Sequence, residues 1–180
     1  MIVAASRFLE WLLEWVTIIL MIGLSVVVVV AVIFRIAGDS LSWYDEVAAI
    51  QLSWITYYGA ALAALKRRHI GFDTVLLAIP MPLRMVALAV AEVIVLGFFV
   101  LMAWAGFKVL DVLQGVRLVS LTWVPVQLTQ SVIPIGAILF IVCELLSLPD
   151  YWRMTAQGRS LEHVEIQEEV EAELHKAGER

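Results

Sequence analysis

Four long apolar blocks, separated by short polar stretches, dominate the chain. We expect membrane-spanning helices at residues 15–36, 45–65, 85–107 and 122–146. A helix rises 1.5 Å per residue, so about 20 residues cross the roughly 30 Å hydrocarbon core of a bilayer. Lipid offers the backbone no other hydrogen-bond partner, so even the valine run at 26–30 is expected to be helical. The pattern predicts an all-α membrane protein with four transmembrane helices.

The second block carries charges of opposite sign at its two ends. Two acids, Asp45 and Glu46, stand at its start, and its end is followed by Lys66, Arg67, Arg68 and His69. The helix dipole favours acids in the first turn and bases after the last. The two ends of this helix are therefore expected to lie at opposite boundaries of the membrane.

Shorter segments lead into or connect the spans. Residues 1–14 are mildly amphipathic, and we expect them to lie at the interface as a lead-in to the first span. A short interfacial helix is predicted at 73–79, with Asp73 as its N-cap and two prolines after it. Pro134 lies inside the fourth block, so a kink is expected there.

The composition supports a membrane domain followed by a polar tail. The chain is 62% hydrophobic and 16% charged, whereas soluble domains average about 45–50% and 25%. From Ser160 onward, seven glutamates face two basic residues, which accounts for the whole net charge of −5. We expect a four-span domain at 1–150, with Glu144 marking the exit of the last span, and an acidic cytoplasmic tail at 151–180. Nothing in this composition supports nucleic-acid binding.

The basic residues predict the orientation. An N-in, C-in topology places seven of them in inner segments and three in outer ones, as the positive-inside rule requires. The inner ones are Arg7, Lys66, Arg67, Arg68, Arg84, Arg153 and Arg159, and the outer ones are Arg35, Lys108 and Arg117. Trp43 and Trp123 then belong to the outer aromatic belt, and Trp11 and Trp152 to the inner one.

Candidate chemistry is sparse. The single cysteine, Cys143, excludes an internal disulfide and is expected to be a small apolar residue that is either buried or lipid-facing. The three histidines all lie outside the predicted hydrocarbon region, and no GxSxG, HExxH or phosphate-binding glycine loop occurs. We expect neither catalysis nor a cofactor nor a metal site.

Glu92 is the one acid expected clearly within a span, about 10 Å from its start. No basic residue inside a predicted span is available to pair with it. Glu92 is therefore expected to be protonated, to reach toward the inner interface, or to pair with a group on another chain. A role as a proton or cation site is an alternative.

Small residues four positions apart recur in the second span, as Ala49/Ser53, Gly59/Ala63 and Ala60/Ala64. Such pairs let helix backbones approach closely. They fit packing within this chain or contact with a second subunit, and both can hold on different faces.

One region carries residues typical of a known family. It contains Trp43, Asp45 and Glu46 at the start of the second span, then an alanine-rich exit, Arg68-His69-Ile70 with Asp73, and a Pro-x-Pro-Leu-Arg motif at 80–84. With four spans of this size, it resembles the small membrane subunit of tripartite ATP-independent periplasmic (TRAP) transporters, DctQ type. The resemblance covers roughly residues 8–153.

The resemblance implies a complex in the bacterial or archaeal inner membrane. In that family a large permease subunit carries the substrate and sodium sites, and a periplasmic binding protein delivers a carboxylate-type solute. The small subunit is similar to a static scaffold. The resemblance implies outer-boundary contacts at Trp43, Asp45 and Glu46, and inner-boundary anchors at Arg68, His69 and Asp73, none of them a substrate ligand.

Other interpretations stay open. An interfacial imidazole capping a helix end also explains His69. The basic residues after the second span are expected to set topology first and to bind anionic membrane lipids second. The alternative function is a four-helix membrane scaffold or assembly factor unrelated to transport.

Overall fold

A computed structural model describes residues 2–67 and 79–157 of the chain. Its elements are α1 (Ile2–Ile36), α2 (Tyr44–Leu65), α4 (Met81–Val112), α5 (Val126–Gln130) and α6 (Val132–Ala156). Four segments are long and apolar enough to cross a membrane, the fourth running through α5 and α6. The described part contains no strand beyond an isolated bridge between Arg117 and Pro125. The expected all-helical fold with four span-length helices is confirmed.

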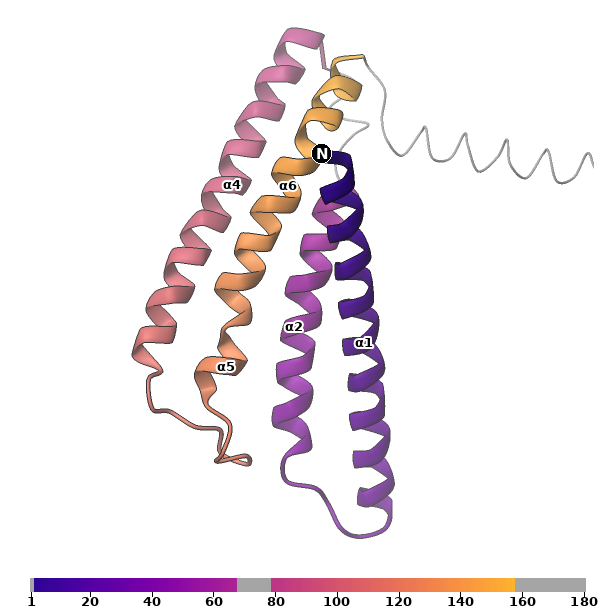
Figure 1. Cartoon of the computed structure of the whole chain (residues 1–180), viewed down its shortest axis with the longest axis vertical. Coiled ribbons are helices and arrows are strands. Elements are labelled where there is room, and N and C mark those ends of the chain that lie inside the picture. Colours follow the sequence, from indigo (N-terminus) through magenta and orange to yellow (C-terminus); the bar gives the residue numbers. More distant parts are fainter. Residues whose placement is uncertain (1, 68–78, 158–180) are drawn as a thin grey trace, which may run out of the picture.

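The four long helices form an open row (Figure 1). α2 packs extensively against α1 and α6, and α6 also packs extensively against α4, while α1 and α6 barely touch. The spatial order is therefore α1, α2, α6, α4, with α1 and α4 at the two edges. Neighbouring helices run in opposite directions, except that α2 and α6 run the same way (Figure 1). Both broad faces of such a row are open, whereas in a closed bundle the inner faces of the helices are covered.

Two glycines of the described helices allow the close approach that this row requires. A Cβ on Gly136 of α6 would lie 2.6 Å from Cβ of Tyr57 on α2. A Cβ on Gly106 of α4 would lie 2.8 Å from Cδ of Pro134 on α6. Both distances are too short for carbon atoms, so a larger residue would force the helices apart.

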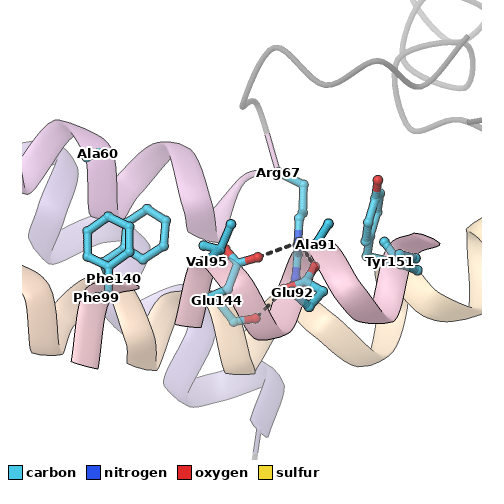
Figure 2. A pocket seen from close by; sticks show the side chains of 10 residues that line it. Ala60, Arg67, Ala91, Glu92, Val95, Phe99, Phe140, Glu144 and Tyr151 are labelled. Atoms are coloured by element: carbon cyan, nitrogen blue, oxygen red, sulfur yellow. Dashed lines mark hydrogen bonds and ion pairs between the residues drawn. The ribbon is translucent and has the colours of Figure 1, made fainter. Parts of the chain in front are cut away.

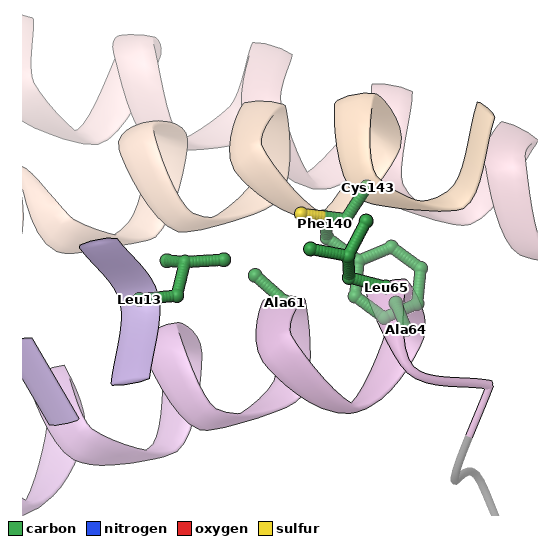
Figure 3. Packing of buried hydrophobic residues seen from close by; sticks show 6 residues of the cluster. All are labelled: Leu13, Ala61, Ala64, Leu65, Phe140 and Cys143. Carbon is green, nitrogen blue, oxygen red and sulfur yellow. The ribbon is translucent and has the colours of Figure 1, made fainter. Parts of the chain in front are cut away.

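Aromatic stacking and a small apolar core complete the packing. Phe99 of α4 stacks on Phe140 of α6 with ring centroids 3.6 Å apart (Figure 2). Figure 3 shows the core cluster, in which α1, α2 and α6 meet; its members are Leu13, Ala61, Ala64, Leu65, Phe140 and Cys143. Cys143 was expected to be either buried or lipid-facing, and it is fully buried there. Most other apolar side chains of α1 and α4 are exposed, as in a helix that faces lipid.

Helix ends differ from the sequence prediction in several places, and four of these differences affect how the chain packs. α1 begins at Ile2, so the 1–14 lead-in and the first span are one helix. α4 begins at Met81, with Pro82 in its first turn, where the missing N–H has no helical partner to lose. α6 continues past Glu144 to Ala156, so the helix extends ten residues beyond the predicted end of the span at 146.

The fourth difference concerns the kink expected at Pro134. The helix is interrupted at Ser131, which separates α5 from α6, and Pro134 lies in the first turn of α6. Proline has no N–H to donate to the carbonyl four residues before it. The hydrogen bond that Pro134 cannot make explains the break at Ser131, about one turn upstream. The predicted interfacial helix at 73–79, with Arg68, His69 and Asp73, and most of the acidic tail lie outside the described residues. The N-in, C-in orientation stays a prediction.

Candidate functional site

The C-terminal end of α2 is the point where the other long helices meet. Lys66 caps the helix, and its N–H bonds to the Leu62 carbonyl at 3.0 Å. Arg67 follows with a φ of 51°, the left-handed conformation that commonly ends helices but usually at glycine. For a residue with a side chain this conformation costs roughly 1 kcal/mol, so compensating contacts are expected around Arg67.

Arg67 makes these contacts with two acids from two other helices (Figure 2). Its Nη1 lies 2.8 Å from Oε1 of Glu92 on α4 and 2.6 Å from Oε1 of Glu144 on α6. The three side chains are only 12%, 10% and 6% exposed. Arg67 therefore joins α2, α4 and α6 through charge-assisted hydrogen bonds in a largely water-free setting.

Further groups on α6 fix the guanidinium. Arg67 Nε donates to Oγ of Ser147 at 2.9 Å, and the Tyr151 ring lies 4.6 Å from the guanidinium carbon. The Ser147 hydroxyl lies 3.2 Å from the carbonyl of Ala64, one of the four carbonyls that have no partner within α2. A side chain of α6 therefore contacts the end of α2, where the backbone N–H groups of Lys66 and Arg67 also bond to the Leu62 and Ala64 carbonyls.

Lys66 forms a second, more exposed set of ion pairs with α1. Its Nζ lies 3.2 Å from Oε1 of Glu10 and also contacts Oε1 of Glu14. The hydrogen bond to Glu14 raises the pKa of Lys66 above its ordinary value. These three side chains are 31–40% exposed, so water screens them far more than it screens the Arg67 set.

Together these residues form what we call the α2-end cluster: Lys66, Arg67, Glu10, Glu14, Glu92 and Glu144. Its carboxylates come from α1, α4 and α6, so α2 is tied to every other long helix at this one level. Two bases face four acids within it. The expectation that these bases act mainly as a topology signal is therefore incomplete, because both also hold the row together.

The cluster corrects the expectation for Glu92. No base within a predicted span was available to pair with it, yet Arg67, just beyond the end of α2, lies within ion-pair distance. The error arose because α2 ends just before Arg67, whereas α4 extends past that level to Met81. From Glu46 to Arg67 the chain spans about 30 Å of helix, so a bilayer centred on α2 would have one of its boundaries near the cluster.

Glu144 is a site residue that sequence reasoning missed. Glu144, Ser147 and Tyr151 lie at positions i, i+3 and i+7 of α6, and all three contact Arg67. That spacing puts polar groups on one face of a helix, a signal that was present in the sequence. The predicted span ended at 146, so Glu144 was assigned to its exit and Tyr151 to the tail, and a shared face was not considered.

A cavity of about 390 Å³ lies beside the Arg67 ion pairs, between α2, α4 and α6 (Figure 2). Its polar wall consists of Arg67, Glu92, Glu144 and Tyr151. The remaining lining is apolar: Ala60, Leu88, Ala91, Val95, Phe99 and Phe140. Its volume falls in the range of small-molecule pockets.

The opposite end of α2 is held by backbone groups. Glu46 accepts hydrogen bonds from the N–H of Val119 at 3.0 Å and from the N–H of Ser120 at 2.9 Å. These residues belong to the connection between α4 and α5, and the Ser120 hydroxyl also donates to the Ser42 carbonyl at 3.0 Å. Glu46 therefore fixes a loop of its own chain.

The other two predicted boundary residues at this end behave differently. Asp45 has an exposed side chain next to Glu46. Trp43 is half-buried and precedes the helix, and its carbonyl accepts the N–H of Val47 at 3.2 Å. Within the described ranges, no three His, Cys, Asp or Glu side chains are placed to hold a metal ion.

Comparison with known proteins gives a family for this chain. Residues 24–153, about 70% of the sequence, match the family described as tripartite ATP-independent periplasmic transporters, DctQ component. No protein with a curated description matches the chain. The matched region runs from the middle of α1 to the last turn of α6, so it includes α2, the Arg67 ion pairs and the Glu46 loop. The chain therefore belongs to the DctQ family, the small permease component of TRAP transporters.

Proposed function

We propose that this chain is the membrane scaffold of an ion-coupled, tripartite uptake transporter in the bacterial inner membrane. It stabilises a large permease subunit, which imports a carboxylate-type solute, with sodium as the coupling ion. A periplasmic binding protein delivers the solute. The family membership supports the assembly, and the charge distribution of the helices supports the division of labour.

The proposal rests on the absence of charged residues from the middle of the described helices. Each described helix has a long run without Asp, Glu, Lys, Arg or His, at 15–34 in α1, 47–65 in α2, 93–107 in α4 and 126–143 through α5 and α6. Transport pathways for ions and charged solutes are lined by such residues or by polar cavities at mid-membrane depth. A subunit whose described helices are uncharged along their middle, and whose buried ion pairs join its own helices, is suited to hold another protein in place.

Uptake measurements test this proposal. The large permease and the binding protein are reconstituted in proteoliposomes with and without this chain, under an inward sodium gradient. We expect solute accumulation only when this chain is present, and none with this chain alone. Accumulation by the large subunit without it would contradict the scaffold role, and accumulation by this chain alone would contradict the division of labour.

The alternative is a four-helix scaffold or assembly factor unrelated to transport. Affinity purification of the tagged chain from its native membrane separates the two possibilities. A large polytopic permease that copurifies in equal amount supports the transporter scaffold. A stable complex that lacks a permease would support the alternative.

We further propose that the boundary residues contact the partner subunit, and Asp45 is the better candidate of the two outer acids. Both oxygens of Glu46 already accept bonds from this chain, whereas the Asp45 carboxylate is exposed. Asp45→Asn should weaken copurification of the large subunit while leaving the folded chain unchanged. Equal recovery with Asp45→Asn would remove Asp45 from the interface. Further candidates for contact with the partner subunit are Trp43, Arg68, His69 and Asp73. We also propose that the N- and C-termini lie in the cytoplasm.

A further inference from the structure

The cavity beside Arg67 contains a carboxylate oxygen without a hydrogen-bond partner. Glu92 is 8% exposed, and its Oε1 is bound by Arg67. Its Oε2 is buried and accepts no hydrogen bond from the described residues. Buried polar atoms without partners are rare and costly in folded proteins. Glu92 lines the cavity, so a donor placed in the cavity could reach this carboxylate.

Acids outnumber bases around the cavity among the described residues. One nitrogen of Arg67 contacts both Glu92 and Glu144, so two acids meet at one guanidinium. The other pair of acids in the cluster contacts Lys66. A cation that carries N–H donors suits both this acid-rich wall and the unbonded oxygen of Glu92.

The shape of the cavity adds an apolar requirement. Val95 and Phe99 follow Glu92 at i+3 and i+7 on α4, so the apolar wall extends about 10 Å from the acids. The stacked pair of Phe99 and Phe140 forms the far end of this wall. The acids lie at the boundary level of α2, so the apolar end lies deeper in the membrane. The cavity is polar at headgroup depth and apolar at acyl-chain depth.

We propose that this cavity is a binding site for a phospholipid with a primary ammonium headgroup, such as phosphatidylethanolamine. Its ammonium donates to Oε2 of Glu92 and places a positive charge beside the two acids. Part of an acyl chain lies along Val95, Phe99 and Phe140. Phosphatidylcholine has a positive charge but no N–H donor, and phosphatidylglycerol has no positive charge, so both should bind more weakly. This site is independent of the proposed transport role.

Native mass spectrometry of the purified full chain tests the site. The protein is incubated with phosphatidylethanolamine, phosphatidylcholine or phosphatidylglycerol of the same acyl chains, and bound lipid is counted. We expect phosphatidylethanolamine to be retained about tenfold more than the other two, as the loss of one charged hydrogen bond implies. Soluble phosphoethanolamine, which has the headgroup without the chains, should not compete at equal concentration.

Variants show whether the cavity is responsible. Glu92→Gln should abolish the preference for phosphatidylethanolamine. Ala91→Phe adds bulk to the lining of the cavity and keeps every charge, so it should reduce retention of this lipid and serves as the test if Glu92→Gln does not fold. Glu10→Gln is the matched control, because Glu10 belongs to the same cluster but does not line the cavity. It should leave the preference unchanged.

Three results would overturn the proposal. The first is equal retention of the three lipids. The second is an unchanged preference in Glu92→Gln or, for a variant that folds, in Ala91→Phe. The third is a complex with the large subunit in which a photocrosslinker at position 91 attaches to that protein and no lipid is retained, which would assign the cavity to a partner side chain.

Discussion

Lys66 and Arg67 are adjacent in sequence, and each contacts two carboxylates, yet their environments differ. The Lys66 set joins α2 to α1 at a half-exposed surface. The Arg67 set joins α2 to α4 and α6 and is almost fully buried. Only Arg67 also contacts a serine hydroxyl and an aromatic ring. Two neighbouring bases with the same number of partners should therefore contribute very differently to the stability of the row.

The physical reason is the cost of removing charge from water. An exposed ion pair contributes about 0–1 kcal/mol, because water and salt screen it. A buried pair contributes little net gain when formed, but removing one partner leaves a buried charge that costs several kcal/mol. The same substitution at positions 66 and 67 should separate these two cases in one protein.

The largest effect is expected for Arg67→Met. It leaves Glu92 and Glu144 buried without a cation, so the free energy of unfolding should fall by about 3–5 kcal/mol. The single cysteine provides the readout, because Cys143 is fully buried in the core beside Glu144. A maleimide dye reacts with its thiol only after the helices separate, so a thermal scan in detergent reports the unfolding midpoint.

A triple variant checks the cause of that loss. Arg67→Met combined with Glu92→Gln and Glu144→Gln removes the unpaired charges together with the cation. We expect it to recover more than half of the stability lost in Arg67→Met alone, since neutral side chains are cheaper to bury. A triple variant as unstable as the single one would show that packing of the arginine side chain, and not charge, dominates.

An intermediate effect is expected for Arg67→Lys. Lysine keeps the charge, but its single ammonium cannot reach Ser147 and both carboxylates with the planar geometry of a guanidinium. We expect a loss of about 1–3 kcal/mol in the same thermal scan. A loss equal to that of Arg67→Met would mean that geometry matters more than charge at this position. No loss would mean that charge matters more than geometry at this position.

The sequence predicted the spans well because hydropathy measures what lipid requires. The second span was predicted at 45–65, and α2 covers Tyr44–Leu65. Hydropathy does not mark where a helix ends beyond the hydrocarbon core. α4 therefore begins earlier than expected, and α6 continues for ten residues beyond its predicted end at 146.

The candidate site was harder to predict because its residues come from three helices that are distant in sequence. Arg67, Glu92 and Glu144 were each noticed, but each was considered within its own segment. Their meeting depends on how α4 and α6 are placed along α2, and close contacts such as Gly136 against Tyr57 set this placement. Neither hydropathy nor local spacing contains that information. The order of the helices in the row could not be predicted from the sequence for the same reason.

The smallest effect is expected for Lys66→Met, which completes the comparison. Glu10 and Glu14 can return to water when their partner is lost, so the unfolding free energy should fall by less than about 1 kcal/mol. Raising the salt concentration should shrink this difference from the wild type further, whereas the loss in Arg67→Met should persist.

The pKa of Lys66 is raised above its ordinary value of 10.5. Its contribution to stability is therefore complete below pH 10.5 and is lost only as the pH rises through the higher pKa of the folded protein. The difference between the wild type and Lys66→Met should therefore be constant from pH 6 to pH 9. A loss at Lys66 as large as that at Arg67 would mean that burial does not distinguish the two sets of ion pairs.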